Sequence, residues 1–366
     1  MSKYRVAIIG RTGKGNYGHG LDTVWKELDN VEVVAVADEH EQGRAEAAQR
    51  VGAPRSYADY RQMLAKERPQ IVAVGPRWLD CHREMVTACA EHGASMFLEK
   101  PLCPTLEDAD AMIAECERRH VKCAIAHQTR YSPRLARAKE LIQAGGLGEV
   151  LEARGRGKED RRGGGEDLMV LGTHVMDLMR LLLGNPQWCQ ARVSDDGVPV
   201  TRETVRAGSE GIGPLAGTTI DAMYGFAHGV TGFFSSHRPK TPGGSRFGLR
   251  ILGTKGMLDI TTGGLAGVHF CEDPNWGSNG SAKPWVLVSS EGLGKPEPLQ
   301  DGGLGMGNVA IAKDLIRAME TDTQPLGSIY DGRAALEMIL AIYESHRTGA
   351  LAPLPLKNRK HPLSLL

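Results

Sequence analysis

Five short apolar runs recur through the first third of the chain, and their spacing limits the possible folds more than any other feature. Val, Ile and Ala stand at consecutive positions in these runs, as in strands that are buried on both faces of a parallel sheet. The stretches between the runs carry helix signals, of which Thr105 as an N-cap is the clearest. This alternation predicts an α/β fold in which residues 1–128 form a doubly wound parallel sheet. The runs end at Gly10, Asp38, Gly75, Lys100 and Gln128.

The pattern changes after residue 128. Ser132-Pro133 predicts the start of a helix and Gly145-Gly146 its end, and the segments from about residue 149 onward resemble antiparallel strands, with a hairpin turn at 253–256. Further helices are expected at about 171–183, 308–320 and 331–347. We therefore expect residues 129–350 to form an α+β domain with an open, largely antiparallel sheet. The Pro- and Leu-rich residues 351–366 are expected to form a C-terminal arm.

Charge and cysteine content exclude several classes of partner. Lys and Arg total 44, as do Asp and Glu, so nothing in the composition favours a nucleic acid. The opening apolar run is too short for a signal peptide or a membrane span, which predicts a cytoplasmic protein without a membrane partner. Seven cysteines without a C-x-x-C pair predict buried, reduced thiols, with no metal site and no disulfide framework.

A glycine-rich loop follows the first apolar run. Residues 10–20 contain the pattern G-x-G-x-x-G at positions 13, 15 and 18, in a loop about three residues longer than the simplest dinucleotide fingerprint. Glycines allow backbone amides to approach a pyrophosphate, which we expect at the N-terminus of the following helix. The cofactor-binding candidates in this loop are Gly10, Arg11, Thr12, Gly13, Gly15 and Gly18.

Asp38 closes the second apolar run, twenty residues after Gly18. An acidic side chain at this position can accept hydrogen bonds from the ribose hydroxyls of the adenosine and would repel a 2′-phosphate. The sequence therefore favours NAD over NADP. The alternative is a glycine turn followed by an aspartate that only caps a helix.

All five runs end in residues that can bind a ligand. The carboxyl ends of parallel strands meet at one edge of the sheet, where open α/β folds bind their ligands. We therefore expect five segments to gather there: Gly10, Asp38, Gly75-Pro76, Glu99-Lys100 and His127-Gln128.

With these residues in place, the chain resembles the Gfo/Idh/MocA family, named for glucose-fructose oxidoreductase, inositol dehydrogenase and a rhizopine-catabolism protein. The resemblance covers essentially the full length. It implies a Rossmann domain followed by an open-faced sheet domain, NAD(P) as cofactor, a sugar, cyclitol or related polyol as substrate, and a homodimer or homotetramer formed through the open sheet. Its further markers are Pro76 with His82, Glu99-Lys100-Pro101-Leu102, Arg130-Tyr131-Ser132-Pro133, the segment 172–177, the turn 253–256 and Asp331-Gly332-Arg333.

The resemblance also implies roles for single residues. It places Lys100 beside the nicotinamide and the substrate hydroxyl, with Pro101 holding the strand end extended, and it matches His174 to the proton-transferring histidine of the family. The remaining cofactor-binding candidates are Gly75, Pro76, Arg77, His82, Glu99, Lys100 and Gln128. The substrate-binding candidates are Lys100, His127, Tyr131, Arg161, Asp167 and His174.

One departure from the family pattern affects the candidate catalytic residues. The family commonly has an aspartate four residues before the histidine, but this chain has Val170. On one helix, residues 170, 174 and 177 share a stripe, so Asp177 is the carboxylate expected to support His174. Glu166 or Asp167 could replace the missing group, although contact of Asp167 with His174 needs a break in the helix. The alternative is that His174 and Asp177 are packing residues of a buried helix.

Two further segments provide candidate residues outside the common family pattern. The loop from Gly75 to His82 is two residues longer than the commonest family form, so Arg77 or Trp78 could reach the cofactor or simply cover the loop. Arg161 lies in the charged run 158–162 and is either a substrate clamp or part of a solvated surface.

Three activities are compatible with this sequence. The first is an NAD-dependent dehydrogenase that transfers hydride at a CH–OH or carbonyl carbon. The second is an enzyme that keeps NAD bound and uses transient oxidation of a glycoside to drive elimination or cleavage. The third is a non-catalytic protein that senses dinucleotides.

Overall fold

The computed structural model describes residues 3–240, 247–275 and 283–366, and the chain divides into two compact units. Unit 1 comprises Met1–Gln128, Ser209–Gly213 and Leu304–Arg333. Unit 2 comprises Thr129–Gly208, Pro214–Gly303 and Ala334–Leu366. Two segments from late in the sequence therefore belong to unit 1, which the apolar pattern of the first third does not reveal.

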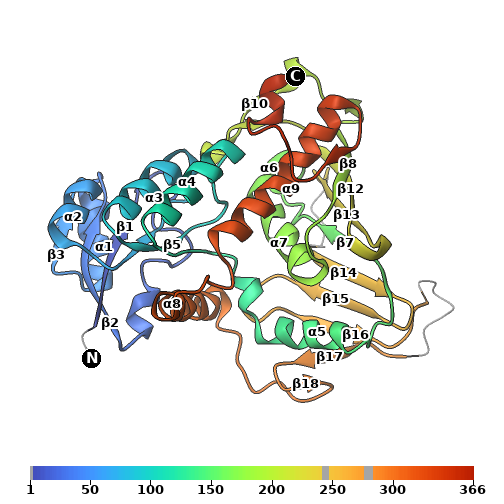
Figure 1. The fold of residues 1–366 in the computed structure, drawn as a ribbon, viewed down its shortest axis with the longest axis horizontal. Helices are drawn as coiled ribbons and strands as arrows, with labels where there is room; N and C mark the ends of the chain where they lie inside the picture. The colour runs from blue at the N-terminus through green and yellow to red at the C-terminus, as the bar shows by residue number, and fades with distance from the viewer. Residues whose placement is uncertain (1–2, 241–246, 276–282) are drawn as a thin grey trace. The chain divides into compact units, whose positions relative to one another are not determined.

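Unit 1 is built on a parallel sheet of six strands in the order β3-β2-β1-β4-β5-β6 (Figure 1). Every residue of β4 and β5 is buried, as the consecutive apolar residues predicted. The order reverses direction at β1, which places a ligand crevice at the carboxyl ends of β1 and β4. The expected doubly wound parallel sheet is thus confirmed. Its strands are β1 Tyr4–Ile9, β2 Val31–Ala37, β3 Arg55–Tyr57, β4 Ile71–Val74, β5 Ser95–Leu98 and β6 Cys123–Ile125.

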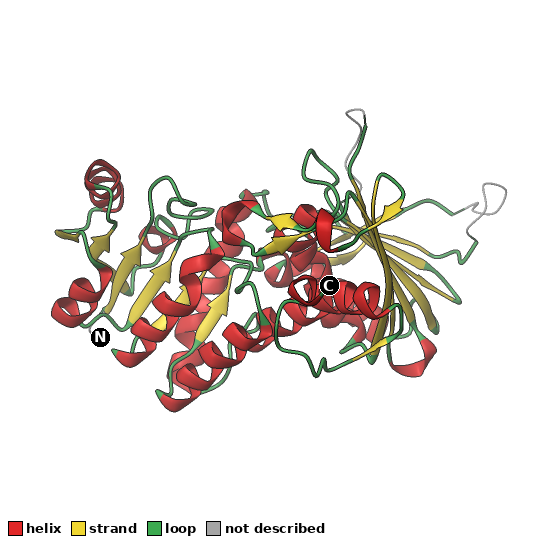
Figure 2. Cartoon of the chain, turned by 90° about the horizontal axis from the view of Figure 1, so that it is seen from above, coloured by secondary structure: helices red, strands yellow, loops and turns green. Residues whose placement is uncertain are grey.

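Helices pack along the strands of unit 1 (Figure 2). The predicted N-cap is confirmed, because the Thr105 hydroxyl accepts a hydrogen bond from Asp108 N at 3.1 Å. The late segment also joins β6, where Ile125 N donates to Gly327 O at 2.8 Å. The helices of this unit are α1 Glu41–Val51, α2 Tyr60–Glu67, α3 His82–Glu91, α4 Leu106–Arg118 and most of α8 Gly303–Thr321.

Unit 2 contains a large sheet in the order β18-β17-β16-β15-β14-β7-β13-β12-β8-β19, with β9 paired to β8. Its neighbours are antiparallel except β7 and β13, so the expected largely antiparallel sheet is confirmed. The predicted hairpin joins β14 and β15, and Gly253 N donates to Gly256 O at 2.9 Å. The strands are β7 Val150–Arg156, β8 Trp188–Asp195, β9 Val198–Pro199, β12 Thr219–Gly225, β13 Thr231–His237, β14 Gly248–Gly253, β15 Met257–Thr261, β16 Val268–Cys271, β17 Val286–Ser289, β18 Gly292–Leu293 and β19 Ala352–Pro353.

The helices of unit 2 lie against one face of this sheet (Figure 2). Buried contacts fix them there: the Tyr224 hydroxyl of β12 donates to Met338 O at 2.9 Å, and Ala191 N of β8 donates to the Ser345 hydroxyl at 3.0 Å. In the part of the chain that the structure describes, no helix covers the opposite face of the sheet (Figure 2). The helices are α5 Pro133–Gln143, α6 Gly165–Val170, α7 Gly172–Leu183 and most of α9 Ile329–Thr348.

The C-terminal residues do not form a separate arm. β19 pairs with β8, and Leu354 N donates to Gln187 O at 2.9 Å. Leu363 is 2% exposed, and the His361 ring centre lies 5.7 Å from that of Tyr343. Ala352, Leu356 and Leu363 are buried, so this segment packs as part of unit 2 and not as the expected separate arm.

All seven cysteines are buried free thiols. Burial raises the pKa of Cys81 to about 11 and that of Cys116 to about 12, which keeps both thiols protonated at neutral pH. None of the described helices is both long enough and apolar enough to cross a bilayer.

His361 predicts a pH dependence of stability. Burial lowers the pKa of His361 to about 4 from 6.5, so the unfolded chain binds more protons than the folded one between these two values. Stability should therefore fall as the pH falls from about 6.5 to about 4, by up to about 3 kcal/mol. Urea unfolding at pH 7.5 and pH 5.0 measures this loss.

His361→Asn is the informative variant, because an asparagine can still cap the last turn but does not titrate. It should flatten the pH dependence, whereas His228→Asn at an exposed turn should not. A His361→Asn protein that loses as much stability as the wild type between the two pH values would contradict the prediction.

Candidate functional site

The glycine loop after β1 folds back as a narrow hairpin. Arg11 and Asn16 pair in an antiparallel bridge in which each backbone N–H donates to the other carbonyl at 3.0 Å. The three glycines of the sequence motif have positive φ, 83° at Gly13, 88° at Gly15 and 69° at Gly18. A left-handed backbone at these positions favours glycine.

Two of these glycines also allow close approach of other segments. A Cβ on Gly15 would lie 2.3 Å from Arg77 N, and one on Gly18 would lie 2.5 Å from Glu99 Oε2. Gly13 has no atom within 4 Å of that position. Gly15 and Gly18 therefore pack the loop against the ends of β4 and β5, whereas Gly13 makes no such close approach.

No α-helix follows the loop, so the expected helix N-terminus at the pyrophosphate is wrong. Between β1 and β2, a stretch that the structure describes in full, there are turns and one four-residue 3₁₀ helix, Val24–Glu27. Gly18 and Gly20, with φ of 69° and 83°, occupy the positions where the first helical turn would form. Right-handed helix cannot continue through residues with left-handed backbone.

The loop nevertheless fits a dinucleotide. Most of its amides are used within the protein, as when Gly13 N donates to Asn16 Oδ1 at 2.9 Å. Gly15 and Tyr17 are buried residues whose amides donate to no atom in the part of the chain that the structure describes. Amide donors in a glycine loop are the groups that bind a pyrophosphate. We take Gly15 N and Tyr17 N as the donors that would hold it.

Asp38 follows β2, and its carboxylate is held by three hydrogen bonds. Oδ2 accepts from Thr12 N at 3.0 Å and from the Thr12 hydroxyl at 2.7 Å, while Oδ1 accepts from His40 N at 3.0 Å. A small pocket adjoins this carboxylate at the position where Rossmann folds bind the adenosine end of a dinucleotide. It is lined by Ile9, Gly10, Arg11, Ala37, Asp38, Glu39, Ala58, Tyr60 and Met85.

Glu99 is fully buried at the end of β5 and binds both the glycine loop and the lysine segment. Its Oε2 accepts from His19 N at 3.0 Å and lies 3.1 Å from His19 Nδ1, while Oε1 accepts from Lys100 N at 3.1 Å. Burial acts to raise the pKa of Glu99, but the hydrogen bonds and charge of His19 outweigh it and lower the pKa. Glu99 thus fixes the backbone at Lys100, which is itself 5% exposed.

A late residue that the sequence did not single out, Asn308 of α8, ties this region together. Its Nδ2 donates to His19 O at 2.8 Å, and its Oδ1 accepts from Gln128 Nε2 at 2.9 Å. Asn308 and Gln128 are 1% and 2% exposed. Gln128, a cofactor-binding candidate, is therefore held by α8, and no local sequence pattern marks Asn308 as its partner.

The loop after β4 is fastened by His82. This histidine is fully buried, and its two ring nitrogens lie 2.7 Å from Pro76 O and 2.9 Å from Leu102 O. Both ring positions are thus used by the protein, so His82 positions the loop and the segment after Lys100 instead of reaching a cofactor. Arg77 lies 3.8 Å from Glu210 of the late segment in unit 1.

In unit 2, the carboxylate of Asp177 on α7 is bound by Arg130. Arg130 Nη2 donates to Asp177 Oδ1 at 2.6 Å, and Nε lies 3.0 and 3.1 Å from the two oxygens. Both residues are buried, so this is a charge pair of the core. His174 lies one turn earlier on α7, and its ring centre is 6.3 Å from that of Phe247.

The helix around Val170 is broken, contrary to the single stripe expected for residues 170, 174 and 177. α6 ends at Val170, Leu171 intervenes, and α7 begins at Gly172. Despite this break, Asp167 binds other groups: its Oδ2 accepts from the Ser236 hydroxyl at 2.6 Å and from Glu159 N at 3.1 Å, and Oδ1 accepts from Lys158 N at 3.2 Å. Burial raises the pKa of Asp167. Its carboxylate therefore holds the loop before α6.

Three consecutive glycines, of which the last is the first residue of α6, allow close packing. A Cβ on Gly163 would lie 2.4 Å from His237 O, one on Gly164 would lie 2.3 Å from Gly217 O, and one on Gly165 would lie 2.2 Å from Ala216 O. The loop that carries Arg161 is thus pressed against two neighbouring segments. Arg161 itself is exposed and, within the described residues, takes part in no ion pair, whereas Asp160 and Arg162 pair with each other at 2.6 Å.

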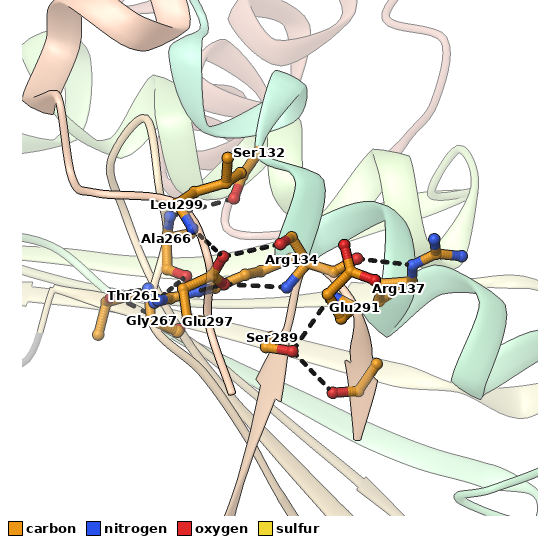
Figure 3. Close-up of polar contacts among 12 residues, drawn as sticks. Ser132, Arg134, Arg137, Thr261, Ala266, Gly267, Ser289, Glu291, Glu297 and Leu299 are labelled. Carbon is orange, nitrogen blue, oxygen red and sulfur yellow. Dashed lines mark hydrogen bonds and ion pairs between the residues drawn. The ribbon is translucent and has the colours of Figure 1, made fainter. Parts of the chain in front are cut away.

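The segment 129–134 anchors unit 2 around its first helix (Figure 3). The Ser132 hydroxyl accepts from Ala266 N at 3.1 Å, and Arg134 Nε donates to Glu297 Oε2 at 2.7 Å. Burial acts to raise the pKa of Glu297, but hydrogen bonds from Arg134 and Ser290 lower it to about 2. Tyr131, a substrate-binding candidate, is half-buried within this anchored segment.

The candidate residues form two sets. Unit 1 brings together the glycine loop, Asp38, the Gly75–His82 loop, Glu99-Lys100 and His127-Gln128. Unit 2 carries Tyr131, Arg161, Asp167, His174 and Asp177. Across the described ranges, no group of three His, Cys, Asp or Glu side chains is arranged to hold a metal ion.

Family models match most of both units. Residues 4–127 match the model of the Gfo/Idh/MocA oxidoreductase family with an NAD-binding Rossmann fold, and residues 135–259 match the Gfo/Idh/MocA C-terminal domain. The chain belongs to the Gfo/Idh/MocA family. The resemblance read from the sequence is confirmed, and unit 1 contains the NAD-binding domain of this family.

Curated relatives share part of the chain. D-apiose dehydrogenase of Paraburkholderia graminis is 28% identical over 195 residues, which cover 50% of this chain and 51% of the relative. Levoglucosan dehydrogenase of Pseudarthrobacter phenanthrenivorans is 27% identical over 248 residues, which cover 61% and 63%. Myo-inositol 2-dehydrogenase of Thermotoga maritima is 26% identical over 262 residues, covering 68% and 74%. The match thus spans about half to three quarters of each relative.

Solved structures share the fold over nearly the whole chain. A levoglucosan dehydrogenase in complex with NADH and L-sorbose has a TM-score of 0.76 at 23% identity, with 97% of this chain and 100% of that chain covered. An oxidoreductase from Agrobacterium radiobacter in complex with NAD⁺, L-tartaric acid and magnesium has a TM-score of 0.72 at 19% identity, with 96% and 98% covered.

The two glycines at the ends of the motif predict different effects of alanine. Gly18→Ala would place a Cβ 2.5 Å from Glu99 Oε2, so the loop must move and NADH binding should weaken by about tenfold or more. Gly13→Ala shares the left-handed strain, which costs about 1–2 kcal/mol, but has free space and should bind NADH nearly as well as the wild type. Fluorescence titration with NADH and thermal unfolding separate the two effects. Equal NADH affinities of the two variants would rule out the packing role of Gly18.

Proposed function

We propose that this protein is an NAD-dependent dehydrogenase that transfers hydride at a CH–OH or carbonyl carbon of a sugar, cyclitol or related polyol. The observation that carries the proposal is Lys100, which lies at the end of β5 in the NAD-binding unit with its backbone fixed by Glu99. The names of the relatives, dehydrogenases of apiose, levoglucosan and myo-inositol, support the substrate class.

Oxidation of an alcohol removes a hydride from carbon and a proton from the hydroxyl. NAD⁺, when bound, supplies the hydride acceptor, so the chain must handle the proton and the charge that develops on oxygen. In this proposal Lys100 Nζ donates a hydrogen bond to the substrate oxygen, and His174 accepts the hydroxyl proton. Carbonyl reduction uses the same two side chains in reverse, with His174 returning the proton.

Asp177 acts in this proposal as a positioning residue. Its carboxylate is bound by Arg130, which fixes α7 one turn after His174. Arg161 is proposed as a substrate contact because it is exposed and, in the described part of the chain, forms no ion pair. His127 and Tyr131 are proposed as further substrate contacts, whereas the hydrogen bonds of Asp167 support an indirect role in holding the Arg161 loop.

A substrate panel tests the function. Purified protein with NAD⁺ is offered sugars, cyclitols and glycosides, and NADH absorbance is followed together with product chromatography. We expect NADH and oxidised product in equal amounts with at least one polyol. Product without net NADH, or NADH binding without turnover of any compound, would contradict the proposal.

Four variants test the proposed roles of single residues. Lys100→Met and His174→Asn should each lower kcat by about 10² or more, the usual contribution of a positioned proton-transfer group, with NADH affinity nearly unchanged. Lys139→Met, an exposed lysine on α5, is the matched control. Arg161→Gln should raise KM more than it lowers kcat, and Asp177→Asn should shift the pH profile of kcat. Wild-type turnover of Lys100→Met would remove that lysine from the mechanism.

We further propose a homodimer or homotetramer formed through the open face of the unit 2 sheet. Directly paired residues form one continuous row across that face, from Met223 through Phe233, Arg154 and Arg250 to Asp259. The Arg154 guanidinium lies 4.8 Å from the centre of the Phe233 ring. Arginine and aromatic side chains are enriched at protein interfaces.

Light scattering after gel filtration tests this interface. The wild type should have a multiple of the 39.5 kDa chain mass, and Phe233→Glu should reduce it. Leu326→Glu, at an exposed leucine of unit 1, should not. A monomeric wild type, or an unchanged mass for Phe233→Glu, would exclude the open face as the interface.

A further inference from the structure

The hydrogen bonds of Asp38 leave its carboxylate with few free acceptor sites for the hydroxyls of a ribose. A carboxylate offers about four lone-pair sites, and three are already filled by Thr12 N, the Thr12 hydroxyl and His40 N. Asp38 can therefore accept about one more hydrogen bond. The adenosine ribose of NAD has two hydroxyl donors, at the 2′ and 3′ positions, so the second one needs another acceptor.

The Thr12 hydroxyl can be that acceptor. Its hydrogen is donated to Asp38 Oδ2 at 2.7 Å, which leaves the lone pairs of Oγ1. Thr12 is only half-buried and lies in the same hairpin as Gly10 and Arg11, which line the pocket beside Asp38. Both acceptors are thus at one edge of unit 1.

Gly43 of α1 makes this arrangement possible. A Cβ on Gly43 would lie 2.0 Å from Thr12 Oγ1 and 2.8 Å from Thr12 Cβ, so any other residue would push the threonine away from Asp38. Gly43 has no positive φ that would otherwise require glycine. The absence of a side chain at this helical position is therefore explained by contact with Thr12.

We propose that Thr12 is a specificity-determining residue of the cofactor site. One ribose hydroxyl donates to Asp38, and the other donates to Thr12 Oγ1. The inference rests on the proposed use of NAD(H) but not on the identity of the substrate.

The same contacts bear on the choice between NAD and NADP. Because three hydrogen bonds pin the Asp38 carboxylate, it cannot rotate away from a 2′-phosphate. The nearby cations are engaged: Arg44 Nη1 donates to Asp38 O at 2.7 Å, and Arg11 Nη1 lies 3.0 and 3.1 Å from the Asp80 oxygens. Thr12 therefore favours NAD over NADP in two ways. It accepts a hydrogen bond from a ribose hydroxyl, and it holds the Asp38 carboxylate, which repels a 2′-phosphate, in place.

Fluorescence titration of the full chain with NADH and with NADPH tests this inference. Thr12→Val should weaken NADH binding by about tenfold, since the loss of a hydrogen bond near a charge is of that order, and should weaken NADPH binding much less. Thr12→Ser should retain the wild-type preference. Gly43→Ala, which keeps the threonine but displaces it, should behave like Thr12→Val. Thr23→Val is the matched control, because Thr23 also lies between β1 and β2 but its hydroxyl bonds to Gly20 O.

Each possible result of these titrations either supports or overturns the role of Thr12. Unchanged NADH affinity in Thr12→Val overturns the inference, and so does an equal loss for NADH and NADPH, because it would mean that Thr12 only holds the loop. If Thr12→Val does not fold, the contrast between Thr12→Ser and Gly43→Ala decides in the same way. A wild type that binds neither nucleotide refutes the proposed function itself, whereas wild-type NADH binding that Thr12→Val retains refutes only this inference.

Discussion

The buried carboxylate of Glu99 is the interaction on which the nucleotide-binding unit depends. A charge without solvent must be matched by donors, and Glu99 finds them in His19 and in the amide of Lys100. Those donors come from the glycine loop and from the strand end that carries the candidate catalytic lysine. Glu99 therefore holds the glycine loop against the end of β5, and a side chain at Gly18 would push the two segments apart.

Much of this unit could be predicted from the sequence because buried parallel strands have a recognisable local pattern of consecutive apolar residues. Consecutive apolar residues located the strands, and the candidate residues that follow them lie at the edge where open α/β sheets bind ligands. The missing helix after β1 could not be read in this way, because glycines at 18 and 20 are compatible with a helix start and with left-handed turns. The place of Asn308 and of residues 209–213 in unit 1 could not be predicted either, because it depends on contacts with residues far away in the chain.

In unit 2 the sequence indicated which residues carry charge but not their partners. Spacing placed Asp177 one turn from His174, yet Arg130, forty-seven positions earlier, binds that carboxylate. Asp167 was a candidate for the missing carboxylate of the family pattern, but Ser236 and two loop amides occupy its oxygens. Helical periodicity gives the direction of a side chain and contains no information about a strand that packs against it. Ion pairs and buried hydrogen bonds therefore cannot be predicted from local sequence patterns.

The position of α8 has a consequence for biosynthesis. Asn308 bridges Gln128 and the His19 backbone, and Gly307 allows α8 to approach because a Cβ there would lie 2.5 Å from that of Gln128. The ribosome makes these residues only after the whole sheet of unit 2 except β19 has been synthesised. A nascent chain that ends at residue 128 has all six strands of the first sheet but lacks the clamp on its glycine loop. The contacts that hold His19 and Gln128 together are therefore complete only once the chain has been synthesised through α8.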